Sequence, residues 1–599
     1  MNEKPESIWK KSWKGRGALV FVFLLLACAI FVAVFALGLL SAKNNSTKEL
    51  LGFAFLISVS IAAALPLLFV FLRWLFCWRN LRRALFALAC LATLIALFYA
   101  EENWRGKHAW EKYKREQEAK GERFDLKSIA PPPVPDDQNF AMIPFWVEQV
   151  SGTMGMEKAK TWYGDKVTAL GHTNFIRPLE MPVELSRISF TNLSGTWQKA
   201  EKSDLKVWQE YFRKLAGVTN FFSVTPQPQK PAEDVLLALS KYDSTIEELR
   251  AASRLPYSRF PLGYNDDNPA GILLPHLAPL KGCVRTLQLR SSAELEAGHS
   301  EKALEDIKLM LRLTEAIRNE PITISHLVRA AMLQIELQPI WEGLAGHNWN
   351  DAQLGALDAE LGKLDFLADY NFFMRGERAF GVGVIDHLRR NRQQFENIVA
   401  PQRDDFSDVT KENAFDRIMN SPLNRLIPKG WFEQSKVAVC QMHSQYLLPI
   451  VNLETHTVSV AAEKRAADAC RGPGTELNPS NWFTRLLLSS LNFMSQKFAR
   501  EQSSTDLARI ACALERYRLV NGKFPETLAA LAPQFLQKIP HDIINGKPLS
   551  YRLTTDGQFI LYSVGWNETD DGGSVVLGKG QTPSVDMKQG DWVWQYPAK

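Results

Sequence analysis

The sequence lacks the common signatures of catalysis. It contains no GxxxxGK[ST] phosphate loop, no strand-linked GxGxxG, no HExxH and no GxSxG. Its ten histidines are scattered. Cys440 and His443 have a metal-like spacing but no second pair, and adjacent Asp386 and His387 on a helix point in different directions. These absences predict no catalytic residue and favour a protein that is not an enzyme. An active site assembled from distant residues stays open.

The net charge is small and cysteines are few. The net charge is only +5 in 599 residues, and no basic stripe is interleaved with aromatics, so we expect no nucleic-acid partner. Four of the seven cysteines, Cys283, Cys440, Cys470 and Cys512, follow the hydrophobic N-terminal part. Four cysteines allow three full pairings. We favour Cys440 with Cys470, which flank one polar stretch, whereas Cys283 and Cys512 lie in helical patterns typical of a core.

The N-terminal hundred residues contain long hydrophobic runs. Residues 18–42 and 51–72 carry no charged side chain, and 84–100 form a third, shorter run. Each approaches the roughly 20 apolar residues that a helix needs to cross a bilayer. The sequence therefore predicts three transmembrane helices rather than a signal peptide or the buried hairpin of a soluble domain.

The basic residues predict the orientation of these helices. Lysine and arginine are dense in residues 1–17 and around 73–83, whereas the loop at 43–50 has only Lys43 and Lys48. Cytosolic loops carry the excess of Lys and Arg. We therefore expect a bacterial-type inner (cell) membrane protein with a cytosolic N-terminus and the bulk of the chain exoplasmic, that is, periplasmic.

After the membrane segments the pattern changes several times. Residues 101–138 predict a juxtamembrane helix and a proline-rich linker, and 139–235 are mixed, with one amphipathic helix at 204–216. From 236 to 500 the hydrophobic period is helical, with helices expected at 280–298, 300–319, 322–346, 351–364, 372–392 and 434–467.

One stripe in this helical region predicts a buried face. Its members recur at three and four residues: Ala303, Leu304, Ile307, Met310, Leu311 and Thr314. The fragment around it, SSAELEAGHSEKALEDIKLML, resembles one tetratricopeptide-type helical hairpin, without a strict 34-residue period. We therefore expect helical hairpins stacked irregularly.

The last hundred residues predict an α+β domain. A helix at 505–519 ends at Asn521-Gly522, a left-handed C-cap signal, and a short helix follows Phe524-Pro525. Residues 549–553 alternate as a half-exposed strand, Asp556-Gly557 predicts a hairpin turn, and 559–564 predict a central strand. Short strands are expected at 575–576 and 592–594.

This order resembles the globular domain of type II secretion pseudopilins. The resemblance covers residues 505–595 and rests on Tyr517, Asn521, Gly522, Phe524, Pro525, Leu528, Leu531, Ile539, Pro540, Asp542, Tyr551, Phe559, Tyr562, Ser563 and Gly565. Unlike that family, the chain shows no prepilin leader and no hydrophobic helix leading directly into this region. The resemblance therefore implies a module rather than a filament subunit.

The resemblance also implies a calcium site, because major pseudopilins bind calcium in the loop after the hairpin. Here that loop is 566–573, with Asp570 and Asp571 as the expected ligands, and Asp591 could close the site. Calcium prefers six to eight oxygen ligands, which such carboxylates supply. A solvated acidic turn is the alternative.

Together these patterns predict a membrane-anchored, mainly α protein. It has a cytosolic tail (1–17), three transmembrane helices (18–100), a juxtamembrane linker (101–138), a mixed exoplasmic region (139–235), an irregular helical-hairpin region (236–500) and a small α+β domain with an antiparallel sheet (501–599). The predicted function is an integral-membrane exoplasmic scaffold with protein partners, in envelope assembly or secretion. The alternative is an exoplasmic hydrolase.

Overall fold

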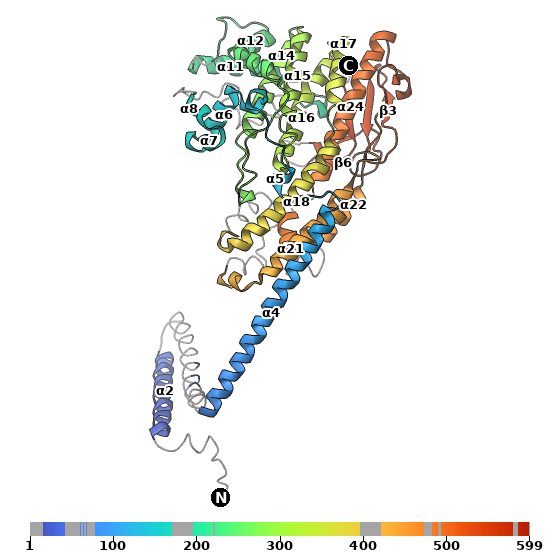
Figure 1. Ribbon diagram of the computed structural model, residues 1–599. Helices are drawn as coiled ribbons and strands as arrows, with labels where there is room; N and C mark the ends of the chain where they lie inside the picture. The colour runs from blue at the N-terminus through green and yellow to red at the C-terminus, as the bar shows by residue number, and fades with distance from the viewer. Residues whose placement is uncertain are drawn as a thin grey trace. The chain divides into compact units, whose positions relative to one another are not determined.

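The chain divides into two compact units, Met1–Trp104 and Arg105–Lys599. The computed structural model describes residues 16–41, 60, 64, 68, 78–169, 196–219, 222–395, 421–471, 482–488, 491, 493–578 and 585–597. The described part is mainly helical, with a small antiparallel sheet near the C-terminus, which confirms the predicted fold class at this level (Figure 1).

In the first unit the structure describes α2 (Arg16–Ser41) and the first part of α4 (Trp78–Glu118). Of the helices in the described residues, α4 alone is long and apolar enough to cross a membrane, and the apolar stretch Phe21–Val34 of α2 is shorter. The second predicted span, 51–72, lies almost entirely outside the described residues. The structure thus supports one candidate span, and the prediction of three is not confirmed.

The second unit begins with short helices and continues into long ones. Helix α5 (Leu126–Ile129) lies in the predicted linker. The mixed region contains α6 (Pro144–Met154), α7 (Met156–Tyr163), α8 (Asp165–Ala169) and α11 (Leu205–Thr219). The helical region contains α12 (Pro231–Leu239), α13 (Asp243–Ala252), α14 (Leu277–Glu296), α15 (Ser300–Glu315), α16 (Thr323–Ala345), α17 (Asp351–Leu361), α18 (Phe366–Arg390), α21 (Lys429–Met442), α22 (Val460–Arg471), α23 (Trp482–Leu488) and α24 (Met494–Asn521).

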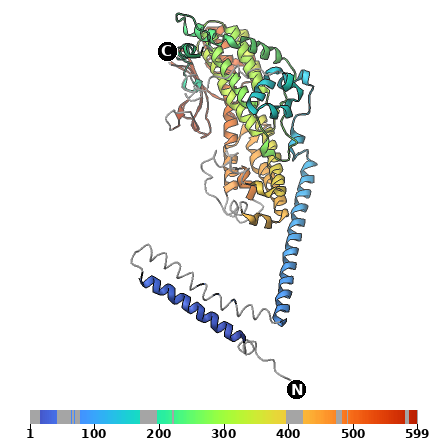
Figure 2. The ribbon, with the colours of Figure 1, turned by 90° about the vertical axis from the view of Figure 1, so that its left-hand side faces the viewer.

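Helices α14, α15 and α16 form the stacked hairpins that the period predicts. Each packs on the other two, as Figures 1 and 2 show in two orientations. The predicted stripe on α15 is buried along its whole length, with Ile307 and Met310 fully inaccessible. Gly298, at φ 83°, makes the turn between α14 and α15, a backbone conformation that favours glycine.

Two helix predictions need correction. Helix α18 begins at Phe366 rather than at 372, because Asp365 caps it by accepting hydrogen bonds from Leu367 N (3.1 Å) and Ala368 N (2.9 Å). The single helix predicted at 434–467 is wrong. Helix α21 passes into one π-helical turn at His443–Leu447, and a small hairpin, β1 (Val451–Asn452) and β2 (Thr457–Val458), precedes α22. Pro449 favours this break, since proline cannot continue the hydrogen-bond ladder.

The C-terminal strands follow the predicted order. One antiparallel sheet has β4 (Phe559–Ser563) in its centre, between β3 (Ser550–Leu553) and β7 (Trp592–Gln595). A second, two-stranded sheet pairs β5 (Val575–Leu577) with β6 (Val585–Gly590), and the sequence pattern did not predict β6. The predicted turns at Gly522 (φ 75°) and Gly557 (φ 78°) are left-handed. In place of the expected short helix stands one 3-10 turn, Leu528–Leu531.

Helix α24 joins this sheet to the helical bundle. It begins eleven residues before the predicted position 505 and packs on α16, α17, α18 and β7. From Phe498 to Leu514 all its side chains except Arg500 and Arg509 are buried, and Arg509 Nε donates to Asp358 Oδ1 of α17 (2.8 Å). One continuous hydrophobic core therefore runs from the first helices of this unit to β7.

Candidate functional site

The three predicted calcium ligands lie around one loop. Asp591, between β6 and β7, is buried and faces the acidic loop after β4: its carboxylate accepts from Asp571 N (3.3 Å), Gly573 N (2.7 Å) and Ser574 N (3.3 Å). Asp570 Oδ1 accepts from the Tyr562 hydroxyl (2.9 Å). The structure thus brings Asp591 to the loop as expected.

These contacts commit the carboxylates to hydrogen bonds. Asp571 Oδ2 accepts from Asn567 Nδ2 (2.8 Å), and burial raises the pKa of Asp591 although three backbone N–H groups oppose this shift. In the part of the chain that the structure describes, no three His, Cys, Asp or Glu side chains gather as a metal centre requires. Calcium binding at Asp570, Asp571 and Asp591 stays a prediction.

A melting experiment on the full-length protein tests this prediction. We expect millimolar calcium to raise the melting temperature after chelation, because a ligand that binds only the folded state adds about 2.7 kcal/mol at a hundredfold excess over Kd. Asp570→Ala together with Asp571→Ala should remove the rise, whereas Glu116→Ala on α4 should keep it. Identical melting with and without calcium would show that Asp591 holds the loop by hydrogen bonds alone.

A cavity with ionisable side chains in its wall lies between α15, α17 and α18. Its volume is about 630 Å³. It is lined by Leu255, Pro256, Ser258, Leu311, Arg312, Glu315, Arg318, Asn319, Glu360, Lys363, Leu364, Ala368, Asp369 and Phe372. None of these positions was a predicted site residue, because they come from four separate segments whose proximity only folding creates.

Ion pairs neutralise the cavity wall. Arg329 of α16 is fully buried behind it and pairs with Asp369 and with Glu315 Oε1 (2.5 Å), while its Nε donates to Thr314 O (3.0 Å). Arg318 completes the network, with Nε 3.4 Å from Asp369 Oδ1 and Nη1 3.3 Å from Glu315 Oε2. Two arginines thus face two carboxylates, an arrangement that positions α15, α16 and α18 against each other.

A buried acid adjoins this network. Glu336 of α16 is fully buried and accepts from the Thr314 hydroxyl. Burial raises its pKa to about 8, against the attraction of Arg329, so this carboxyl is mostly protonated at neutral pH. A neutral Glu336 leaves the two charged pairs balanced.

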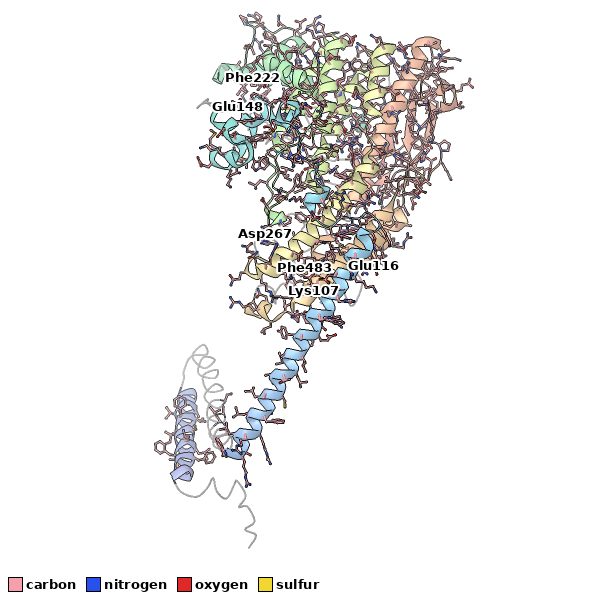
Figure 3. All side chains as sticks on the ribbon, in the orientation of Figure 1. Lys107, Glu116, Glu148, Phe222, Asp267 and Phe483 are labelled. Atoms are coloured by element: carbon pink, nitrogen blue, oxygen red, sulfur yellow. The ribbon has the colours of Figure 1, made fainter. Side chains whose placement is uncertain are left out.

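The cavity offers little to catalysis. Of the described residues that line it, Ser258 carries the one hydroxyl, and none is a histidine or cysteine that would activate it. The adjacent pair Asp386 and His387 does not form a catalytic dyad, because the two side chains have different partners. Asp386 accepts from Lys436 (3.1 Å), while His387 contacts Asp267 O (3.0 Å) in the loop labelled in Figure 3. Cys440 and His443 are both buried, and burial raises the pKa of the Cys440 thiol to about 12.

No family model, curated protein or solved structure matches this chain. Its function must therefore be argued from its own residues.

The favoured cysteine pairing is wrong. The structure joins none of the cysteines that it describes by a disulfide. Cys440 packs with Trp110 and Val382, whereas Cys470 lies in the main core, so the two belong to different groups of buried side chains. Cys283 and Cys512 are core residues, as the helical pattern predicts.

The last part of α4 is held tightly within the second unit. A Cβ at Gly106 would lie 2.1 Å from the carbonyl oxygen of Gly430 in α21, so this approach requires glycine. One turn on, Trp110 packs edge-on to Phe124 (5.6 Å between centroids), and Lys436 Nζ lies 4.4 Å from the Trp110 ring. The part of α4 from Arg105 on is therefore an integral part of the second unit.

Proposed function

We propose that this chain is an integral-membrane scaffold that presents an exoplasmic helical body and a pseudopilin-like module to protein partners in envelope assembly or secretion. The main support for this proposal comes from helix α4. One helix, Trp78–Glu118, contains both the candidate membrane span and the segment that packs on α21. A chain that contains a candidate membrane span and a large folded helical body suits a protein that holds partners at a membrane.

The ionic network supports a scaffold over a hydrolase. A hydrolytic site needs a nucleophile beside a base, with unpaired donors for the developing charge. In the cavity between α15, α17 and α18 the charged groups of Arg318, Glu315 and Asp369 bind each other instead. Paired charges of this kind order a fold, whereas catalysis uses charges that remain available to a substrate.

The proposed topology has three transmembrane helices, 18–42, 51–72 and 84–100, with the N-terminus in the cytosol. Its support is the excess of Arg and Lys in 1–17 and 73–83. The pseudopilin-like module is supported by the strand order and turns at Gly522 and Gly557, and it forms one body with the helices through α24.

Reporter fusions test anchor and orientation together. We expect cytosolic activity for fusions at residues 8 and 80, and exoplasmic activity for a fusion at residue 300, in cells that insert the protein normally. Exchanging Arg79, Arg82 and Arg83 for glutamine should weaken this orientation, and the same exchange at Lys112, Lys114 and Arg115 should not. A cytosolic signal at residue 300 would contradict the proposal.

A further inference from the structure

The contacts between α18 and α21 show that the two helices are antiparallel. Lys436 Nζ lies 3.1 Å from Asp386 Oδ1, and Arg389 Nη1 lies 3.2 Å from Glu433 Oε1. From the first pair to the second, the position advances along α18 and goes back along α21. The last turn of α18 therefore lies beside the first turn of α21, and the two helices pack together (Figure 1).

The segment before α21 closes this end of the helix pair. In η8 (Pro422–Leu426), Asn424 O accepts from Arg392 Nη1 (2.6 Å), and Asn424 Nδ2 donates to Arg392 O (3.3 Å). Helix α4 reaches the same place, because Gly106 packs against the backbone of Gly430 in the first turn of α21. The second unit begins one residue before Gly106, so the chain enters this unit at the end that α18 and α21 form.

The covalent chain keeps this end close to the predicted membrane span. That span, 84–100, ends six residues before Gly106. Six residues reach at most about 22 Å even when fully extended, and the headgroup region of a bilayer is itself roughly 5–8 Å thick. With the proposed membrane anchor in place, the first turn of α21 is therefore within reach of the lipid headgroups.

The surface at this end carries one apolar and several basic side chains. Leu426 is 62% exposed, and Arg425 and Lys429, on either side of it in the sequence, are exposed as well. Among the residues that the structure describes, no acid forms an ion pair with Arg425 or Lys429. The side chain of Lys107, which follows Gly106 and is labelled in Figure 3, is 73% exposed. We call Lys107, Arg425, Leu426 and Lys429 the basic rim.

Exposed acids near the basic rim do not balance its charge. Glu111 lies 3.7 Å from Lys107, in an exposed pair of the kind that contributes little to stability. Asp267 pairs with Arg390 in the last turn of α18 (3.2 Å), and Asp266 beside it is exposed. Because Arg425 and Lys429 add two positive charges to these pairs, this end of the second unit keeps an excess of positive charge.

We propose that the basic rim docks on acidic phospholipids at the membrane surface, with Arg425 and Lys429 against the phosphate groups and Leu426 at the boundary of the acyl chains. Acidic headgroups complement the charge of the rim, and a leucine between cations suits that boundary. Each basic side chain close to such a surface favours the docked state about fivefold. The inference rests on the proposed membrane anchor and adds a contact that orients the scaffold's helical body.

Lipid contact is tested with the full-length protein in nanodiscs of phosphatidylglycerol and phosphatidylcholine. A photoreactive phenylalanine analogue replaces Leu426, and lipid adducts are identified by mass spectrometry after irradiation. We expect phosphatidylglycerol adducts at this position, with a yield that falls as salt is raised. The matched control carries the analogue in place of Leu553 on β3, which is 42% exposed and lies toward the other end of the second unit in Figure 1, and it should give no lipid adduct.

A charge variant tests whether the cations hold the rim on the lipid. Arg425→Gln together with Lys429→Gln should lower the ratio of docked to undocked protein about thirtyfold, and the adduct yield with it, because two favourable charges are lost. The matched double variant Lys206→Gln with Lys302→Gln removes the same charge from other exposed positions and should leave the yield unchanged. Both variants should melt like the wild type, since all four side chains are exposed.

The outcomes separate docking from anchoring. If the inserted protein gives no lipid adduct at position 426, docking is overturned and the membrane anchor stands. An adduct yield that is the same for both double variants would also overturn docking through the basic rim. Adducts between two copies of the chain in place of lipid adducts would assign this end to a protein interface instead. A chain that does not enter the nanodiscs would overturn the anchor, and docking with it.

Discussion

Arg329→Ala is expected to destabilise the folded body by about 3–5 kcal/mol, the cost of leaving a buried charge without its partner. The guanidinium is fully buried, and it binds the carboxylates of Asp369 and Glu315 and the carbonyl of Thr314. Arg318, which is 36% exposed, cannot replace it, because it approaches both carboxylates from the outer side at 3.3–3.4 Å. Truncation therefore leaves Asp369, which is only 3% exposed, with the partly exposed Arg318 as its remaining partner.

Chemical denaturation of the full-length protein, followed by the fluorescence of its buried tryptophans, measures this loss. The matched control is Arg390→Ala, which removes an arginine whose partner Asp267 is 76% exposed, and it should cost less than about 1 kcal/mol. A double-mutant cycle of Arg329→Ala with Asp369→Ala isolates the pair. Equal losses of unfolding free energy for Arg329→Ala and Arg390→Ala would show that the buried ion pairs do not stabilise the fold.

Ile307→Ala is expected to cost about 2–5 kcal/mol, the range for truncating a buried aliphatic side chain. Ile307 is at 0% exposure in the middle of the α15 stripe, and Leu304, one turn earlier, is at 4%. The stripe packs on α14 and α16, so the lost methyl groups leave a cavity that three helices surround and cannot easily close.

The matched control for this truncation is Ile324→Ala in α16. Ile324 is 55% exposed, so its truncation removes little buried surface, and alanine favours helix more than isoleucine does. The denaturation midpoint of Ile324→Ala should lie close to that of the wild type, and that of Ile307→Ala well below it. If Ile307→Ala unfolds at the wild-type midpoint, the buried stripe of α15 does not stabilise the helical bundle.

Local patterns predicted the elements of this fold well. The helices α14, α15 and α16 were expected within a few residues of their observed ends, since their hydrophobic period and the glycine at 298 are local signals. The central position of β4 followed from its apolar faces. The break after α21 was missed because a helical period continues through residues that adopt a π-turn and a small hairpin.

The three aspartates predicted to bind calcium show what a local pattern leaves open. Asp570 and Asp571 are adjacent in the sequence, and Asp591 was expected to approach them, which it does. The sequence does not encode which backbone N–H groups reach the Asp591 carboxylate, because that depends on how β6 and β7 place it against Gly573 and Ser574.

The sequence by itself determined the apolar N-terminal runs, the buried stripe of α15 and the order of strands, because hydrophobic period and turn residues act over a few neighbouring positions. Only the tertiary structure decided which charges meet. Arg329 pairs with Asp369 forty residues away, and Arg509 pairs with Asp358 across 151 residues. Such meetings depend on how helices pack, and a buried charge is costly or harmless according to the partner that packing supplies.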